Sequence, residues 1–355
     1  MANSINIDLG SLLPYFEEKL NSFIGRDMLS TTLKEIVRNV IQSGEQLSRS
    51  VQIVGMAQPI PIERIYQPTL LKNENFKPPQ FCLQDLIERQ QDAVIFAGPG
   101  FGKTTLLHWE YHHLRLKSSC LPLLFTLRWE GAVESLETIV SALQSGRHVT
   151  RDDKVRLVLF VDGYDEVSED IRRRVSRTLM SYAALDVGQF YLTCREFYPI
   201  IDLKALHCRL ASFCRDDSIR FIKAFAGVFS GSIDAELLFT ELQGRGFADF
   251  LSHPLLLALV CILRTSANPN IPTNAIGLVR RAIDTLSFRW DASKSLHRGS
   301  GISLDGEERM RCLMRIAYRM DAMSSPAPRV EAAVKEHLHQ ILTCTFWVQP
   351  SPSLS

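Results

Sequence analysis

The stretch AVIFAGPGFGKTT, residues 93–105, decides the fold class of this 355-residue chain. Its first five residues are apolar, as in a buried strand, and the residues after the loop continue with helical periodicity. Between them, Gly98, Gly100 and Gly102 allow the backbone to curl so that its N–H groups point inward at an anion. The stretch therefore predicts a strand, an anion-binding loop and a helix in direct succession.

The loop matches the pattern G-x-x-x-x-G-K-[ST], with Ala97 where the first glycine is usual. In this pattern the backbone and the positive end of the helix cradle phosphate groups. The lysine reaches the β- and γ-phosphates, and the hydroxyl residue binds Mg²⁺. Lys103 and Thr104 are predicted to take these two roles. The predicted nucleotide-binding residues of the loop are Ala97, Gly98, Pro99, Gly100, Phe101, Gly102, Lys103, Thr104 and Thr105.

A second stretch, RLVLFVDGYDEV, residues 156–167, ends an apolar run in three carboxylates. An ordinary Asp-Gly turn would account for it. The phosphate loop favours another explanation, in which the acids face a cation at the carboxyl edge of a parallel sheet. Asp162 is predicted to hold Mg²⁺ beside Thr104, on a strand next to the strand of the loop. Asp165 and Glu166 are candidates to orient or deprotonate a water that attacks a γ-phosphate, with Asp165 slightly favoured.

The segment LTCRE, residues 192–196, ends the next predicted strand. Arg195 is predicted to sense the γ-phosphate and to belong to the catalytic set, because its fixed fork of donors suits phosphate oxygens. Thr193 is a candidate to touch the water or the phosphate. A solvated arginine beyond a strand is the alternative.

Apolar runs that alternate with helical patterns predict the architecture. Strands are predicted at 93–97, 121–127, 156–162, 189–194 and, more weakly, 206–212, with helices at 102–116, 133–145 and 168–184. This order indicates an α/β fold with a parallel sheet of the P-loop NTPase kind and helices on both faces. Only helical patterns follow, at 216–229, 232–243, 254–265, 275–291, 306–322 and 328–343.

The chain is accordingly divided into five segments. They are an N-terminal helical segment at 1–50 with amphipathic helices over 11–48, an extended proline-rich segment at 51–80, the NTPase core at 81–230, a helical region at 231–347, and a disordered tail at 348–355. Prolines 59, 61 and 68 are expected to exclude a helix from 54–68 and to indicate chain laid across a surface.

Composition excludes several classes of function. The net charge of +1 gives no general attraction to nucleic acid or to a membrane surface. The longest apolar run, residues 254–263, is about half of the roughly 20 residues that span a bilayer. No secretory signal is recognised, and the eight cysteines form no C-x-x-C pair. A cytoplasmic protein is expected. The basic cluster IRRRVSR, residues 171–177, is interpreted as a solvated helix face, with an arginine finger in an oligomer as the alternative.

The motifs AGPGFGKTT, LVLFVDGYDEV and FYLTCRE together resemble the NACHT family of STAND signalling ATPases, which includes the NLR proteins, over roughly residues 50–290. FLSHPLLLALVCIL, residues 250–263, is similar to the family's proline motif, which implies that Pro254 contacts adenine. IERIYQP, residues 62–68, is similar to a segment that helps to cover the base. His253 and His297 are candidates for the histidine that grips the β-phosphate of ADP in a winged-helix-like part of relatives. The family's effector domain and repeats are not recognised in this sequence.

The resemblance implies a switch. ADP would be held in a closed form, ATP would replace it after a trigger, and the open form would self-associate, with slow ATP hydrolysis and Mg²⁺ as cofactor. Its relatives act in innate immunity or antiviral defence through trigger and effector proteins. Two other functions remain open: a steadily cycling P-loop ATPase or kinase, and a non-catalytic adaptor whose N-terminal helices recruit an effector.

Overall fold

The computed structural model of the chain describes residues 31–53, 58–117, 119–145, 156–196, 203–228, 233–265 and 271–274, with positions 200, 277, 278, 280, 281, 311 and 315. The chain divides into two compact units, residues 1–283 and 284–355, and nearly all of the described residues belong to the first unit. Several predictions lie outside the described residues. They are the first N-terminal helix, most of the helices at 275–291 and 306–322, the helix at 328–343, the winged-helix-like part, and the tail at 348–355.

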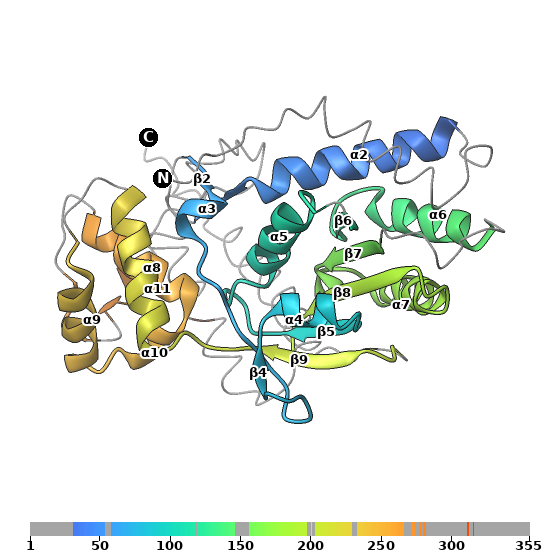
Figure 1. The fold of residues 1–355 in the computed structure, drawn as a ribbon. Helices are drawn as coiled ribbons and strands as arrows, with labels where there is room; N and C mark the ends of the chain where they lie inside the picture. Colours follow the sequence, from blue (N-terminus) through green and yellow to red (C-terminus); the bar gives the residue numbers. More distant parts are fainter. Residues whose placement is uncertain are drawn as a thin grey trace, which may run out of the picture. The chain divides into compact units, whose positions relative to one another are not determined.

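A seven-stranded sheet with the order β4-β3-β9-β5-β8-β7-β6 forms the centre of the first unit (Figure 1). Five of its strands run parallel, at nearly the predicted bounds: β5 (Ala93–Phe96), β6 (Cys120–Thr126), β7 (Arg156–Asp162), β8 (Gly188–Cys194) and β9 (Leu206–Leu210). The α/β fold class is confirmed. Strand β8 lies between β5 and β7, so the expectation that the strand of Asp162 adjoins the strand of the loop was wrong.

Short antiparallel strands were not predicted. Strands β3 (Leu71–Lys72) and β4 (Gln80–Phe81) extend the sheet beyond β9, and β1 (Ser50–Val51) pairs with β2 (Ile60–Pro61) apart from it. The main sheet is therefore mixed, with an antiparallel edge on a parallel centre. A strand of two residues contains no alternation of apolar and polar side chains, which is the signal used to predict strands.

A one-turn helix, α3 (Ile62–Ile65), interrupts the proline-rich segment. Pro61 is its N-cap residue with a φ of −51°. Proline is tolerated at a helix start because the first N–H groups have no partner within the helix. The expectation that the prolines exclude a helix was therefore wrong for these four residues. The chain is extended again at Tyr66, whose ψ is 136°.

Helices cover both faces of the sheet, as predicted. On one face α2 (Thr31–Ser48), α6 (Ala132–Ser145) and α7 (Glu169–Ala183) share an apolar core with the strands. On the other face α4 (Leu83–Glu88) and α5 (Lys103–Leu114) share a second core. Helix α2 confirms the second predicted N-terminal helix.

Helix α2 also packs directly against α5. Gly44 approaches Tyr111 so closely that an added Cβ would lie 2.7 Å from the ring, and the Tyr111 hydroxyl donates to the carbonyl of Ile41 at 3.3 Å. Beside them the buried carboxylate of Glu45 lies 3.2 Å from Nη1 of Arg115, the residue that follows α5. Burial raises the pKa of Glu45, and the two positive charges of Arg115 and Arg49 oppose the shift.

A third core is formed by helices α8 (Arg215–Val228), α9 (Ala235–Gly244), α10 (Ala248–Ser252) and α11 (Pro254–Thr265). Helix α11 has the predicted bounds, whereas α10 was not predicted. Ile53, Ile60 and Ile65 also belong to this core, so the proline-rich segment does lie across a surface, that of the helices. None of the described helices has both the length and the apolar character that crossing a bilayer requires.

Glu110 of α5 is a buried carboxylic acid, and the pH dependence of stability tests its burial. Its side chain is buried, and burial raises its pKa from 4.5 to about 7, against the opposing hydrogen bond of Gln84. Because the folded pKa lies above the unfolded one, the bound proton stabilises the fold below pH 4.5, and this stabilisation is lost as the pH rises through about 7. We expect Glu110→Gln to gain about 2–3 kcal/mol over the parent chain between pH 5 and pH 8.

Urea unfolding of both proteins at the two pH values measures this gain. Asp92, whose pKa burial raises to about 6, contributes equally to both chains and cancels in the comparison. A stability difference that is the same at both pH values would contradict the prediction.

Candidate functional site

A cavity of about 330 Å³ lies at the carboxyl edge of the sheet, where the phosphate loop, the proline-rich segment and the helices α8 and α11 meet. Its volume is within the range of pockets for small molecules. One end is polar, with Lys103, Thr104, Thr105, Asp162, Asp165, Glu166, Thr193 and Arg195. The other end is largely apolar, with Val51, Ile53, Ile65, Phe213, Phe221, Pro254, Leu255 and Ala258.

The predicted loop has the backbone that its glycines suggest. Gly100 and Gly102 have φ values of 78° and 93°, a region that favours glycine, and α5 begins directly after them at Lys103. All residues from Pro99 to Thr105 line the cavity. Ala97 and Gly98 instead contribute carbonyl groups, which accept hydrogen bonds from Nζ of Lys103 at 2.8 and 3.1 Å.

The ammonium group of Lys103 is partly desolvated. Burial lowers its pKa, and the negative charges of Asp165 and Asp162 oppose the shift. A positive charge withdrawn from water beside a glycine-rich loop gains more from an anion than an exposed lysine does. The loop and Lys103 together therefore favour an anion at this end of the cavity.

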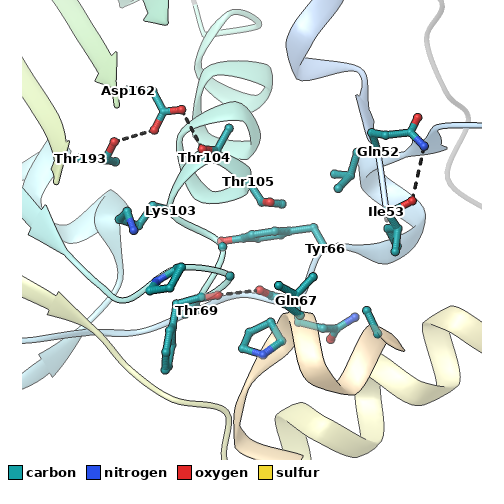
Figure 2. A pocket seen from close by; sticks show the side chains of 18 of the residues that line it. Gln52, Ile53, Tyr66, Gln67, Thr69, Lys103, Thr104, Thr105, Asp162 and Thr193 are labelled. Atoms are coloured by element: carbon teal, nitrogen blue, oxygen red, sulfur yellow. Dashed lines mark hydrogen bonds between the residues drawn. The ribbon is translucent and has the colours of Figure 1, made fainter. Parts of the chain in front are cut away.

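Asp162 is held by two threonine hydroxyls, as Figure 2 shows. Thr104 at the start of α5 donates to Oδ2 at 2.7 Å, and Thr193 at the end of β8 donates to Oδ1 at 2.5 Å. The Thr193 hydroxyl also accepts from the N–H of Gly163 at 3.0 Å. Its contacts are thus with Asp162 and Gly163, whereas the sequence suggested a contact with the water or the phosphate. The position of β8 between β5 and β7 makes this contact possible.

The pair Thr104 and Asp162 fits a magnesium ion. Both offer oxygen atoms, the ligand type that Mg²⁺ prefers, and the two oxygens lie 2.7 Å apart at the rim of the phosphate loop. Among the described residues, no group of three or more His, Cys, Asp or Glu side chains is placed to hold a metal ion by itself. Mg²⁺ in such a site uses one or two protein ligands together with phosphate and water oxygens.

The two acids beyond Asp162 each contact an arginine. Asp165 accepts from Nε of Arg195 at 2.8 Å and from its backbone N–H at 3.0 Å, and its side chain is only 5% exposed. Glu166, which is 34% exposed, lies 3.4 Å from Nη1 of Arg128. Both carboxylate oxygens of Asp165 are therefore engaged, whereas Glu166 has one weak and partly solvated contact.

Arg128 was not among the predicted site residues. It follows strand β6, whose last residue Thr126 pairs with Asp162 of β7. The carboxyl ends of parallel strands meet at one edge of a sheet, so the polar residues after each predicted strand are candidates for the site. Arg128, just after the predicted strand at 121–127, carries that signal.

The predicted base-covering elements also reach the cavity. Ile65, Tyr66 and Gln67 of the proline-rich segment line it, and so does Pro254 at the start of α11. Figure 2 shows the ring of Tyr66 in the cavity between the labelled side chains of Thr105 and Gln67. The ring stacks on Trp109 of α5 with centroids 4.4 Å apart, and burial raises the pKa of its hydroxyl.

Two other predicted features have different outcomes. His253, the residue between α10 and α11, contacts the phosphate loop, and its Nε2 lies 3.0 Å from the carbonyl oxygen of Pro99. His297 lies outside the described residues. In the basic cluster of α7, Arg173 pairs with Glu169, and Arg174 pairs with Glu134 and Glu137. These pairs agree with a solvated, salt-bridged helix face.

Comparison with known proteins gives distant structural neighbours. No family model and no curated protein matches the sequence. The RuvB Holliday junction branch migration motor of Thermotoga maritima has a TM-score of 0.35 at 15% identity, over 58% of this chain and 65% of the motor. A Walker-type ATPase of Pyrococcus abyssi has a TM-score of 0.41 at 14% identity, over 72% and 86%. Domain III of the Thermotoga maritima replication initiation protein DnaA has a TM-score of 0.35 at 13% identity, over 57% and 88%.

The chain thus covers less than two thirds of the RuvB motor, and similarities of this size carry no argument about activity. The fold is established by the chain's own structure. A parallel sheet in which a strand, a glycine-rich loop and a helix follow one another, with a carboxylate from a second strand beside the loop, is that of a P-loop NTPase.

Proposed function

We propose that this chain binds ATP and ADP with Mg²⁺ and acts as a nucleotide-controlled switch of the NACHT type. The observation that carries the proposal is the pair Thr104–Asp162 beside Lys103, in a cavity whose far wall is built by the helices α8 and α11. The phosphates would lie on the loop, with Lys103 on the β- and γ-phosphates. Thr104 and Asp162 would hold Mg²⁺, which offsets the negative charge of the phosphates when it is bound.

The apolar end of the cavity would hold the base. Phe213, Phe221 and Ala258 offer flat or small apolar surfaces, and Pro254 lies at the junction with the loop. Tyr66 and Gln67 would cover the base from the proline-rich segment. The resemblance to NACHT proteins supports adenine as this base.

The arginine contacts support slow hydrolysis. The guanidinium and the backbone N–H of Arg195 occupy the two oxygens of Asp165, so this carboxylate is poorly placed to accept the proton of an attacking water. Glu166 is the better candidate for the base because its contact with Arg128 is long and partly solvated. Asp165 would instead hold Arg195, and a γ-phosphate would compete with Asp165 for that guanidinium.

The shared cavity supports a switch. Residues of the α/β part and of the helical part line one site, so a ligand that touches both favours the arrangement in which they are close. Shifting such an equilibrium from 1:99 to 99:1 takes about 5.5 kcal/mol of differential binding. We propose that ATP, Mg²⁺ and contacts between copies of the chain supply it, in innate immunity or antiviral defence, with trigger and effector proteins as further partners.

Native mass spectrometry of the purified chain, with ATP or ADP and Mg²⁺, tests the proposal. We expect one nucleotide per chain, adenine as its base, and larger assemblies with ATP than with ADP. Fast turnover by a monomer, or transfer of phosphate to an added acceptor, would favour a cycling ATPase or kinase instead. A folded chain that binds no nucleotide at millimolar concentration would refute the proposal.

Thr193 gives a prediction about the metal. Thr193→Val keeps the shape of the side chain but leaves Oδ1 of Asp162 and the N–H of Gly163 without this hydroxyl. We expect the gain in ATP affinity caused by Mg²⁺ to fall about tenfold, because an unrestrained carboxylate binds the cation less well. Calorimetry with Mg²⁺ and with EDTA measures the gain.

Thr193→Ser is the matched control, because it restores the hydroxyl. It should bind nucleotide as the parent does under both conditions. If the valine variant keeps the full effect of Mg²⁺, Thr193 does not orient a metal ligand.

A further inference from the structure

Four successive carbonyl groups of the phosphate loop are hydrogen-bonded, and two of the donors come from the helical part of the chain. Nζ of Lys103 donates hydrogen bonds to the carbonyls of Ala97 and Gly98. The backbone N–H of Leu255 donates to the carbonyl of Gly100 at 3.2 Å, and Nε2 of His253 lies 3.0 Å from the carbonyl of Pro99. Since a carbonyl only accepts, Nε2 of His253 carries the proton in this contact.

The loop lies in close contact with the corner between α10 and α11, which is formed by residues 253–255. An added Cβ on Gly100 would lie 2.7 Å from Cβ of Leu255 and 2.8 Å from Cε1 of His253. The ring of Phe101 also meets the imidazole of His253 edge to face, with centroids 4.3 Å apart. The loop therefore contacts the corner through the backbone of Gly100, through the side chain of Phe101 and through two hydrogen bonds.

This arrangement follows from what an anion-binding loop requires. When successive N–H groups turn toward an anion, the carbonyl groups between them turn away from it. Carbonyl groups withdrawn from water need donors, or the conformation loses stability. The corner provides such donors for Pro99 and Gly100, the two carbonyls that Lys103 does not contact.

We propose that His253 is a positioning residue that holds the phosphate loop in its anion-binding conformation. Through it, the docking of α8–α11 controls how long a nucleoside diphosphate stays bound. The proposal rests on the proposed function, because it concerns regulation of the same site. It assigns His253 to the loop's backbone and not to the phosphate itself.

The reciprocal effect is required by thermodynamics. If the docked corner strengthens nucleotide binding by stabilising the loop, then bound nucleotide strengthens the docking of the corner by the same factor. Burial lowers the pKa of His253, so the ring is mainly neutral at pH 7 and its single N–H is committed to Pro99.

The test measures the dissociation of a fluorescent ADP derivative, displaced by excess ADP in a stopped-flow instrument. His253→Leu removes the donor and keeps an apolar side chain against Phe101. We expect its dissociation rate to rise about tenfold at a nearly unchanged association rate. His253→Gln, which keeps an N–H donor, should stay within about threefold of the parent. A leucine variant as slow as the parent, or a glutamine variant as fast as the leucine variant, would overturn the assignment.

A second measurement needs no variant and covers the case in which His253→Leu fails to fold. Hydrogen exchange of the parent chain should show that ADP slows exchange of the amide of Leu255, which is bonded to Gly100. Exchange there that is unchanged by saturating ADP would overturn the proposal. Failure of the proposed function itself is distinguishable, because the parent chain would then bind no ADP in either experiment.

Discussion

Replacement of Lys103 by alanine should weaken binding of ATP and ADP by at least about 100-fold. Lys103 is the partly desolvated cation at the loop, and it also holds the carbonyls of Ala97 and Gly98. Lys103 is proposed to donate one hydrogen bond to the β-phosphate and one to the γ-phosphate. Hydrogen bonds to charged groups contribute about 1.5–3 kcal/mol each, so the loss of both corresponds to a factor of about 100 or more in affinity. Titration with a fluorescent nucleotide, followed by competition with ATP and ADP, measures the loss.

The matched control is Lys223→Ala. Lys223 lies on the exposed side of α8, so this variant removes the same charge away from the cavity. It should bind as the parent does. Circular dichroism should show that Lys103→Ala remains folded. A folded Lys103→Ala variant with parental affinity would remove the site assignment and the proposed function with it.

Replacement of Glu166 by glutamine should lower the rate of ATP hydrolysis by about 100-fold or more, with nucleotide affinity changed less than about threefold. General base catalysis contributes about 10²–10⁴-fold, and glutamine keeps the size of the side chain without its basicity. Single-turnover hydrolysis of ATP measures the chemical step separately from release of ADP.

Asp165→Asn is the informative comparison. Asp165 engages Arg195 with both oxygens, so its replacement should chiefly change the preference for ATP over ADP by releasing that arginine. The opposite result, a large loss of hydrolysis in Asp165→Asn and a small one in Glu166→Gln, would return the base to Asp165, which the sequence alone slightly favoured.

Much of the α/β fold could be predicted because its strongest signals are local. The run from Arg156 to Asp162 is long and apolar enough for a buried strand, and β7 has those bounds. The phosphate loop combines glycines, a lysine and a hydroxyl in a fixed spacing that few other structures need. Pro254 marks the start of α11 because proline suits the first turn of a helix.

The features that were missed depend on partners far away in the sequence. Nothing near residues 188–194 indicates that this strand inserts between β5 and β7, so the contact between Thr193 and Asp162 was not foreseen. The two-residue strands β3 and β4 exist because β9 offers them an edge to pair with. The pairing of Glu166 with Arg128 joins residues 38 positions apart.

The contacts of Gly44 and Glu45 in α2 with Tyr111 of α5 and with Arg115, which follows α5, have a mechanical consequence. Helix α5 has 12 residues and is about 18 Å long, a stiff rod with the phosphate loop at one end. The buried Glu45 and Arg115 join α2 to its other end, and Glu63 of α3 contacts His112 along its side at 2.8 Å. A load applied to α2 is therefore applied to the same rod that carries Lys103. A displacement of α2 is thus expected to displace the phosphate loop, which leads directly into α5.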